Sequence, residues 1–245
     1  INHNAGSEWV ECDEETLGLI QYAFHLYEIS NGLFDITSGV LRSVWNFQEA
    51  KIPSSDSIKK ILPLIGLNYL ERNGSKVKLA KKGMQIDLGG IGKEYAVDKV
   101  TAILQSNGIE SALINFAGDL RAINTSKQVH LWHIGIQNPR CTQESVASIP
   151  VKHGALTTSG DYERYFELNQ KRYCHILNPK TAYPVRYWRS VTVLAPLTIA
   201  AGATSTIAML LEKNGLEFLR NSGFAYLAID HKGQIYKSDI NSGIN

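Results

Sequence analysis

The chain has 245 residues, of which 44% are hydrophobic and 20% charged, and its formal net charge is +2. This size and composition are typical of a globular protein with one large domain or two small ones. The small net charge and the lack of basic runs argue against a general polyanion binder, and no apolar run is long enough to cross a bilayer. The three cysteines lack metal-ligand spacing and are odd in number, which argues against a disulfide framework.

The first third of the chain contains three predicted elements. Residues 14–29 are predicted to form an amphipathic helix, because Asp13 is a suitable N-cap and apolar residues recur at helical spacing. A second helical stretch is expected over residues 56–64. Residues 69–79 are predicted to form a hairpin, because Asn73-Gly74 is a strong turn signal.

Between the two helices lies the segment LFDITSGVL (33–41), in which Asp35 allows two interpretations. Asp35 could cap the turn Thr37–Trp45, which is the commoner role for an acid in such a position. Alternatively, Phe34 and Asp35 could form a wall and a hydrogen-bond acceptor for a flat ligand with a polar edge.

The stretch MQIDLGGIGKEYAVD (84–98) reads as a short strand, an acid, two adjacent glycines and a helix. Gly89 and Gly90 let the backbone turn tightly and approach a ligand closely. Backbone N–H groups at the start of the helix would suit a phosphate, and Lys93 would add a charged donor there. Strand–turn–helix connections of this kind are common and most bind nothing, so a purely structural turn is the alternative.

The remaining elements mix strands and helices without regular alternation, which favours an α+β fold over a doubly wound sheet. We expect a single compact domain over residues 1–245. The predicted strands are 84–86, 111–116, 129–136, 146–151, 154–158, 164–168, 171–176, 191–195, 223–229 and 234–238, the pair near residue 170 forming a hairpin. The predicted helices begin near Ile91, with Val97, Val100, Ile103 and Leu104 on the apolar side, and at Ile199, ending at Leu211.

Several segments together resemble the FAD:protein FMN transferases, the ApbE family. They are NGLFDITSGVL (31–41), IDLGGIGKEYAVDKV (86–100), ALINFAGDLRA (112–122), WHIGIQNP (132–139), TTSGDYERYF (157–166) and YCHILNPKTAYPV (173–185), and VTVLAP (191–196) with the following helix matches too. The resemblance implies a protein that splits FAD at its pyrophosphate, moves FMN onto a Thr hydroxyl of a target protein and releases AMP. The family normally has residues before the position where this chain begins, so we expect part of the flavin pocket to lie outside this chain.

The resemblance also implies roles for individual residues. A flavin nucleotide would be lined or contacted by Leu33, Phe34, Asp35, Asp87, Gly89, Lys93 and Ile176. Gly90 would offer its main-chain carbonyl to Mg²⁺, and Thr206 a hydroxyl. These residue types suit the chemistry, because pyrophosphate needs a metal and N–H donors while the incoming hydroxyl needs a proton acceptor.

His175 lies near a predicted strand end, where a lone histidine is more often a structural residue. Within YCHILNP (173–179), which matches the family pattern, the resemblance implies that His175 is the acid/base group or orients the phosphate. A nucleophilic pair of Cys174 and His175 is disfavoured, because adjacent side chains on a strand point to opposite faces.

The sequence departs from the family pattern at the expected metal site. Where the family usually has an acidic Mg²⁺ ligand this chain has Gly202, and Ser205 stands at a second, variably acidic position. Hydroxyls are poor substitutes for carboxylates on a hard divalent ion, so we expect weak Mg²⁺ binding that Gly202→Asp would strengthen. Three further departures replace a glycine of the family pattern: Glu94, Ala117 and Ala182.

Two functions of different class therefore remain open. The first is an FMN transferase that acts on FAD and on a protein acceptor carrying a target Thr. The second is a non-catalytic paralogue that binds a flavin or adenine nucleotide, or a protein partner. The resemblance implies a periplasmic or membrane-anchored location, with a cytoplasmic one left open.

Overall fold

The computed structural model describes residues 1–126 and 131–238, and its internal contacts divide the chain into two units. Unit 1 comprises Ile1–Gly89 and Arg164–Val185, and unit 2 comprises Gly90–Glu163 and Arg186–Asn245. Each unit is built from two separate segments of the chain. The expectation of a single domain over the whole chain stays a prediction.

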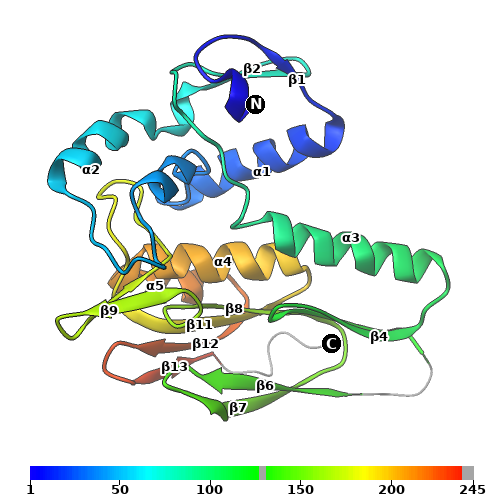
Figure 1. The fold of residues 1–245 in the computed structure, drawn as a ribbon. Coiled ribbons are helices and arrows are strands. Elements are labelled where there is room, and N and C mark those ends of the chain that lie inside the picture. Colours follow the sequence, from blue (N-terminus) through cyan, green and yellow to red (C-terminus); the bar gives the residue numbers. More distant parts are fainter. Residues whose placement is uncertain (127–130, 239–245) are drawn as a thin grey trace. The chain divides into compact units, whose positions relative to one another are not determined.

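Unit 1 combines helices with short antiparallel strands (Figure 1). Strands β1, β3 and β2 form a sheet in that order, and β9 pairs with β10. The helices are α1 (Glu14–Ile29) and α2 (Ser55–Ile61), and the strands are β1 (Val10–Glu11), β2 (Leu70–Asn73), β3 (Lys76–Leu79), β9 (Tyr165–Leu168) and β10 (Lys171–Cys174).

An aromatic core joins the two chain segments of unit 1. Trp45 packs with Phe166 and Tyr173, whose rings stack at a centroid distance of 5.0 Å. The indole N–H of Trp45 also donates a 2.7 Å hydrogen bond to the carbonyl of Ala182. Ring burial of this kind stabilises the unit beyond the contribution of local helix and hairpin formation.

The helix at 14–29 is confirmed, and the Asp13 carboxylate accepts a 2.7 Å hydrogen bond from the Thr16 N–H. The first hairpin is confirmed with a shifted turn, because Asn73 pairs with Lys76 and leaves residues 74 and 75 as the loop. The helical stretch at 56–64 consists of α2 followed by a 3₁₀ turn.

The predicted strand Met84–Ile86 is wrong. Only Gln85 takes part in a β-bridge, with Ser38, so Asp87 does not end a strand. The neighbouring segment turns into the 3₁₀ helix Gly39–Ser43 directly after Ser38, which leaves no extended partner for a longer ladder. The hydrogen bond from the Asp87 N–H to the Ile36 carbonyl (2.8 Å) is what remains of the pairing.

Unit 2 is built on a six-stranded antiparallel sheet with the strand order β13-β12-β11-β8-β5-β4. A separate hairpin pairs β6 with β7. The sheet strands are β4 (Ser111–Phe116), β5 (Asp119–Asn124), β8 (Gly154–Gly160), β11 (Trp188–Ala195), β12 (Ala225–Asp230) and β13 (Ile235–Lys237), the hairpin strands are β6 (Trp132–Asn138) and β7 (Cys141–Val151), and the helices are α3 (Gly92–Ser106), α4 (Thr198–Leu210) and α5 (Gly215–Asn221). Antiparallel sheets with separate helices confirm the α+β class.

The sheet of unit 2 separates two apolar layers. Helix α4 packs on β8 and β11 over one face, and the β6–β7 hairpin lies against the other face (Figure 1). Side chains of alternate β11 residues pack into the two layers, because successive side chains of a strand point to opposite faces. Leu194 joins the cluster beneath the hairpin, which contains Ile136, Ile149 and Leu227.

Several predictions for unit 2 need correction. Strands β7 and β8 are longer than expected, and α5 was not predicted, because seven residues carry too little periodicity. Residues 129 and 130 of one predicted strand lie outside the described residues. Ile103 is 57% exposed and does not belong to the apolar side of α3, whose buried residues are Glu94, Val97 and Thr101.

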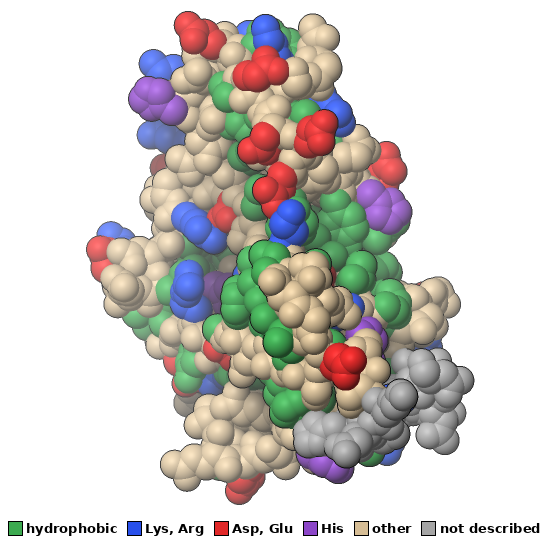
Figure 2. Space-filling view, turned by 90° about the vertical axis from the view of Figure 1, so that its right-hand side faces the viewer, with side chains coloured by type: hydrophobic (Ala, Val, Ile, Leu, Met, Phe, Trp, Pro, Cys, Tyr) green, Lys and Arg blue, Asp and Glu red, His purple; other side chains and the backbone are tan. Residues whose placement is uncertain are grey.

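The charges on the surface, the hydrophobicity of the helices and the state of the cysteines are as follows. Charged side chains of both signs are interspersed on the face drawn in Figure 2. Within residues 1–126 and 131–238, no helix has the length and hydrophobicity of a membrane span. All three cysteines lie in the described part of the chain, and they form no disulfide.

Candidate functional site

Helices α3 and α4 of unit 2 pack against each other, and Asp98 of α3 fixes their register. Its carboxylate accepts hydrogen bonds from the backbone N–H groups of Thr198 (3.0 Å) and Ile199 (2.9 Å), the first residues of α4. These groups carry the positive end of the helix dipole, and Leu197 at the N-cap position has no side chain that could satisfy them. Asp98 therefore caps α4 from a neighbouring helix.

One turn before Asp98, the side chain of Glu94 lies against Gly202, one turn after Thr198. A Cβ atom added to Gly202 would lie 2.5 Å from Cγ of Glu94 and 3.0 Å from its Cδ and Oε1 atoms. The Glu94 side chain therefore occupies the space that a larger residue at position 202 would need. Asp98 contacts Thr198, and Glu94, one turn earlier on α3, contacts Gly202, one turn later on α4. Helices α3 and α4 therefore run antiparallel.

The two predicted metal-binding residues of unit 2 are Gly90, which lies two residues before α3, and Thr206, which lies one turn beyond Gly202 on α4. The Thr206 hydroxyl lies 3.1 Å from the hydroxyl of Ser159 on β8. Ser159 also lies 2.8 Å from the Ser205 hydroxyl, which donates to the carbonyl of residue 202 at 3.0 Å. The Ser205 hydroxyl is thus engaged within the unit.

Glu94 is buried, with 7% of its surface exposed, and its Oε2 atom has no hydrogen-bond partner among the described residues. Burial, and next the negative charge of Asp119, raise the pKa of Glu94 to about 7, while the charge of Lys93 opposes the rise. Burial likewise raises the pKa of Asp119, whose Oδ2 atom lies 2.8 Å from Nζ of Lys93. Buried carboxyls with such shifts are costly to the fold and are enriched at functional sites.

These oxygens fit a magnesium ion. In the described ranges no cluster of three or more His, Cys, Asp or Glu side chains could hold a metal. Mg²⁺ does not require one, because it is usually bound through one or two carboxylates and the phosphates of its substrate. The unpaired Glu94 oxygen, the Thr206 hydroxyl and the Gly90 carbonyl are hard donors of the required type.

In unit 1, the carboxylate of Asp35 organises its own loop. It accepts hydrogen bonds from the N–H (2.8 Å) and hydroxyl (2.6 Å) of Thr37 and from the N–H of Leu67 (3.2 Å). Burial raises the pKa of Asp35, and these hydrogen bonds oppose the rise. The capping interpretation accounts for the Thr37 contacts, and a ligand role for Asp35 stays a prediction.

Asp87 is held beside the same loop by a pair of contacts. Its Oδ2 atom lies 2.6 Å from the Arg42 guanidinium, and its Oδ1 atom accepts a 2.7 Å hydrogen bond from the Gly89 N–H. A Cβ atom at Gly39 would lie 2.9 Å from Cβ of Asp87, so the close packing of the two segments requires glycine there. Arg42 thus adds a cation that is 68% exposed next to two predicted nucleotide contacts.

The other predicted residues of unit 1 differ in exposure. Phe34 and Ile176 are buried, Leu33 is half-buried, and His175 is exposed just after β10. The His175 N–H donates a 2.9 Å hydrogen bond to the Arg164 carbonyl, which fixes the backbone. The adjacent Cys174 is buried, so their side chains face different environments, as argued from the strand geometry.

Comparison with known proteins decides the family. The model of the ApbE family matches residues 1–228. The chain belongs to the ApbE family. A protein of Treponema pallidum named FAD:protein FMN transferase is 31% identical over 230 residues, covering 86% of this chain and 64% of the relative. A protein of the same name from Escherichia coli K12 is 30% identical, covering 85% of this chain and 63% of the relative.

Solved ApbE structures are also similar. The ApbE protein from Thermotoga maritima has a TM-score of 0.89 at 35% identity and covers 98% of this chain and 80% of its own. The flavinyl transferase ApbE from Pseudomonas stutzeri, in its apo form, has a TM-score of 0.83 at 28% identity, with 97% and 77% coverage. The chain spans slightly less than two thirds of the T. pallidum and E. coli relatives.

One expectation drawn from the ApbE resemblance must be revised. Gly202→Asp was expected to strengthen metal binding by itself, but a side chain at position 202 requires the Glu94 side chain to move. Two of the five departures from the ApbE pattern, the glutamate on α3 and the glycine on α4, are therefore in direct contact. Sequence inspection gave no signal for this, because the two positions are far apart in the chain.

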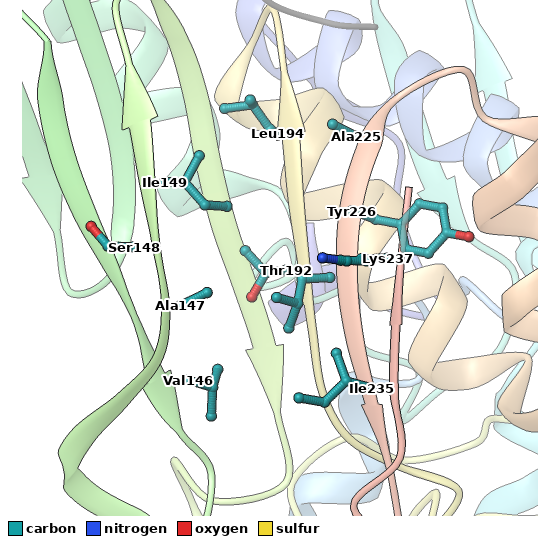
Figure 3. A pocket seen from close by; sticks show the side chains of 11 residues that line it. Val146, Ala147, Ser148, Ile149, Thr192, Leu194, Ala225, Tyr226, Ile235 and Lys237 are labelled. Atoms are coloured by element: carbon teal, nitrogen blue, oxygen red, sulfur yellow. The ribbon is translucent and has the colours of Figure 1, made fainter. Parts of the chain in front are cut away.

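A mostly apolar pocket of unit 2 is lined by other residues than these. The pocket, of about 370 Å³, opens between the β6–β7 hairpin and the sheet face opposite α4 (Figure 3). Its lining is mostly apolar, and Lys237 is the one charged side chain in it. The lining residues are Val146, Ala147, Ser148, Ile149, Thr192, Leu194, Ala225, Tyr226, Leu227, Ile235 and Lys237. None of the residues predicted to bind nucleotide or metal lines this pocket, and its lining does not suit a pyrophosphate.

Proposed function

We propose that this chain carries the activity for which its ApbE relatives are named, the transfer of FMN from FAD to a protein. The proposal is supported by family membership and by identities near 30% over most of the chain. The observation that carries it is the packing of α3 against α4, which places the buried carboxyl group of Glu94, with one unpaired oxygen, against Gly202.

The reaction consists of a single displacement at phosphorus. The hydroxyl oxygen of the acceptor Thr attacks the phosphorus of the FMN half, the bond from that phosphorus to the bridging oxygen breaks, and AMP leaves with that oxygen. The hydroxyl proton passes to a base. We assign His175 to this acid/base role or to orienting the phosphate, because it is exposed and an imidazole titrates near neutral pH.

Binding of FAD is assigned to the residues that the ApbE resemblance implies. Leu33, Phe34 and Ile176 would contact the flavin nucleotide, and Asp35, Asp87 and Gly89 would contact its polar groups. Lys93 would approach the pyrophosphate as a charged donor. Bound Mg²⁺, held through Gly90 and Thr206, would neutralise charge that develops on the phosphates.

The alternative of a non-catalytic paralogue rested on the loss of the acidic ligand at position 202. The carboxylate that Glu94 brings against Gly202 supports the transferase over this alternative. A protein acceptor with a target Thr and a periplasmic or membrane-anchored location remain part of the proposal.

The test is incubation of the protein with FAD, Mg²⁺ and a flavin-accepting protein domain that carries the target Thr. We expect AMP, measured by chromatography, in equal amount to covalently bound flavin, measured by in-gel fluorescence. The domain with Thr replaced by Val is the control and should remain unlabelled. His175→Gln should lower the rate by about 10²–10⁴-fold if the imidazole transfers the proton. FAD that stays intact in the presence of acceptor and Mg²⁺ would refute the proposal.

A further inference from the structure

The contacts of the Glu94 carboxyl group, which include a side-chain hydrogen bond with Asp119, do not satisfy both of its oxygens. Glu94 is buried on α3, and its Oε2 atom lacks a hydrogen-bond partner among the residues that the structure describes. A buried polar oxygen without a partner destabilises a fold, and a group of the same shape without charge would avoid that cost. The neighbouring Asp98 shows the contrast, since both of its oxygens cap α4.

The glycine at position 202 leaves the space that the Glu94 side chain fills. Gly202 is buried on α4, and the hypothetical Cβ atom at this position would lie 2.5 Å from Glu94 Cγ. Glycine inside a helix is less favourable than alanine, so the glycine at position 202 calls for a reason in its surroundings. It makes room for the Glu94 side chain.

The Glu94 carboxyl group lies beside that of Asp119, with which it shares a side-chain hydrogen bond, and has no ion pair of its own among the described residues. The nearby cation, Lys93, pairs with Asp119 at 2.8 Å. On α4, Thr206 lies one turn beyond Gly202 on the same helical face. A second carboxylate thus lies beside Glu94, and Thr206 offers a hydroxyl one turn further along α4. Oxygen donors of these types are the ligands of Mg²⁺ and Mn²⁺.

We propose that Glu94 provides the carboxylate of a divalent-cation site between α3 and α4, in the space that Gly202 leaves open. In this chain the acid is on α3 and the glycine on α4, whereas the ApbE pattern has the acid on α4 and the glycine on α3. This inference rests on the proposed function, because the cation would serve the pyrophosphate of FAD. It differs from the proposed function in predicting which side chain binds the ion.

The test is a binding measurement with Mn²⁺ as the probe. Free Mn²⁺ is measured by electron paramagnetic resonance during titration of the whole protein, with and without ADP as a source of pyrophosphate. Glu94→Gln keeps the size of the side chain and removes its charge. Glu217→Gln removes one charge from an exposed position on α5 of the same unit and is the matched control.

We expect Glu94→Gln to weaken Mn²⁺ binding in the presence of ADP at least about tenfold, since even residues behind a metal ligand change affinity by 10–100-fold. The control should bind as the wild type does. Gly202→Asp alone should also weaken binding, because it displaces Glu94. The exchange variant Glu94→Gly/Gly202→Asp should regain affinity to within about threefold of the wild type, which a merely structural role of Glu94 would not produce.

Unchanged Mn²⁺ affinity in Glu94→Gln, or no Mn²⁺ binding by the wild type with ADP, would overturn the inference. Loss of affinity in the exchange variant, when its circular dichroism is native, would also overturn it. The proposed function fails separately. If Mn²⁺ binds through Glu94 but FAD and acceptor yield no AMP, only the transferase assignment falls, whereas full AMP release by Glu94→Gln leaves that assignment and removes Glu94 from the site.

Discussion

Asp98 and Glu94 are two carboxylates one turn apart on α3, and both face α4. They differ in their hydrogen bonds to that helix. Asp98 gives both oxygens to the first N–H groups of α4 and lies 3.4 Å from the Arg121 guanidinium. Glu94 fills the gap at Gly202 and keeps one oxygen unpaired. A carboxylate whose oxygens both accept hydrogen bonds stabilises the fold. A buried carboxylate with an unpaired oxygen lowers the stability of the fold, which indicates that it has a ligand.

The comparison also shows how the first acid serves the second. By capping α4, Asp98 fixes how far α3 and α4 slide along each other, and this decides that Glu94 meets Gly202. The structural carboxylate therefore positions the candidate ligand. The following changes break or sharpen this division of roles.

The largest expected effect is on stability, from Asp98→Asn. It removes the charge next to the buried Arg121 and weakens the cap of α4, so we expect the free energy of unfolding to fall by about 3–5 kcal/mol. The measurement is the midpoint of urea unfolding. Asp56→Asn on α2, whose pair with Lys59 is exposed and 3.9 Å long, is the control and should change stability little. Equal effects of the two variants would mean that Asp98 is no more than a surface acid.

A smaller effect, on the pH dependence of stability, is expected from Glu94→Gln in metal-free protein. The pKa of Glu94 is raised from 4.5 to about 7, so between these pH values the folded state holds a proton that the unfolded state releases. Stability of the wild type should therefore fall as pH rises through this window. Glu94→Gln should reduce the slope, leaving the part due to Asp119, whose pKa is raised in the same direction.

The measurement is thermal unfolding in EDTA at a series of pH values from 4 to 8. Two profiles of the same slope would show that the folded protein does not disfavour the ionised Glu94. That outcome would place Glu94 with Asp98 as a carboxylate that the fold accommodates at no cost.

The smallest effect concerns the turn that carries Asp119 to Glu94. Ala117 in this turn has a φ of +49°, a left-handed conformation that costs an L-residue about 1–2 kcal/mol. Ala117→Gly should therefore raise the free energy of unfolding by up to about 1 kcal/mol, less the entropy that glycine adds to the unfolded chain.

Ala182 offers the matched comparison. It has a φ of +61° but is fully buried, so Ala182→Gly also loses the burial of a methyl group. That loss, about 0.8 kcal/mol, should bring the net change close to zero. Urea unfolding of both variants measures the difference, and destabilisation by Ala117→Gly would show that the turn is not strained.

The sequence by itself determined the local elements and the family. The Asp13 cap, the amphipathic spacing of α1 and the turn signals of the hairpins act over a few residues, so their outcome can be read from neighbouring letters. The motifs that resemble the ApbE family led to the family that the comparisons show, and the strands of unit 2 were largely found, although their ends were not.

Only the tertiary structure decided how the distant segments combine. The apparent strand at 84–86 lost its ladder because its partner segment coils at Gly39, and Asp98 caps a helix that begins a hundred positions later. Glu94 and Gly202 looked like two independent losses from a pattern, although they are in contact. Steric exclusion between their side chains acts through space, and no local property of either position records it.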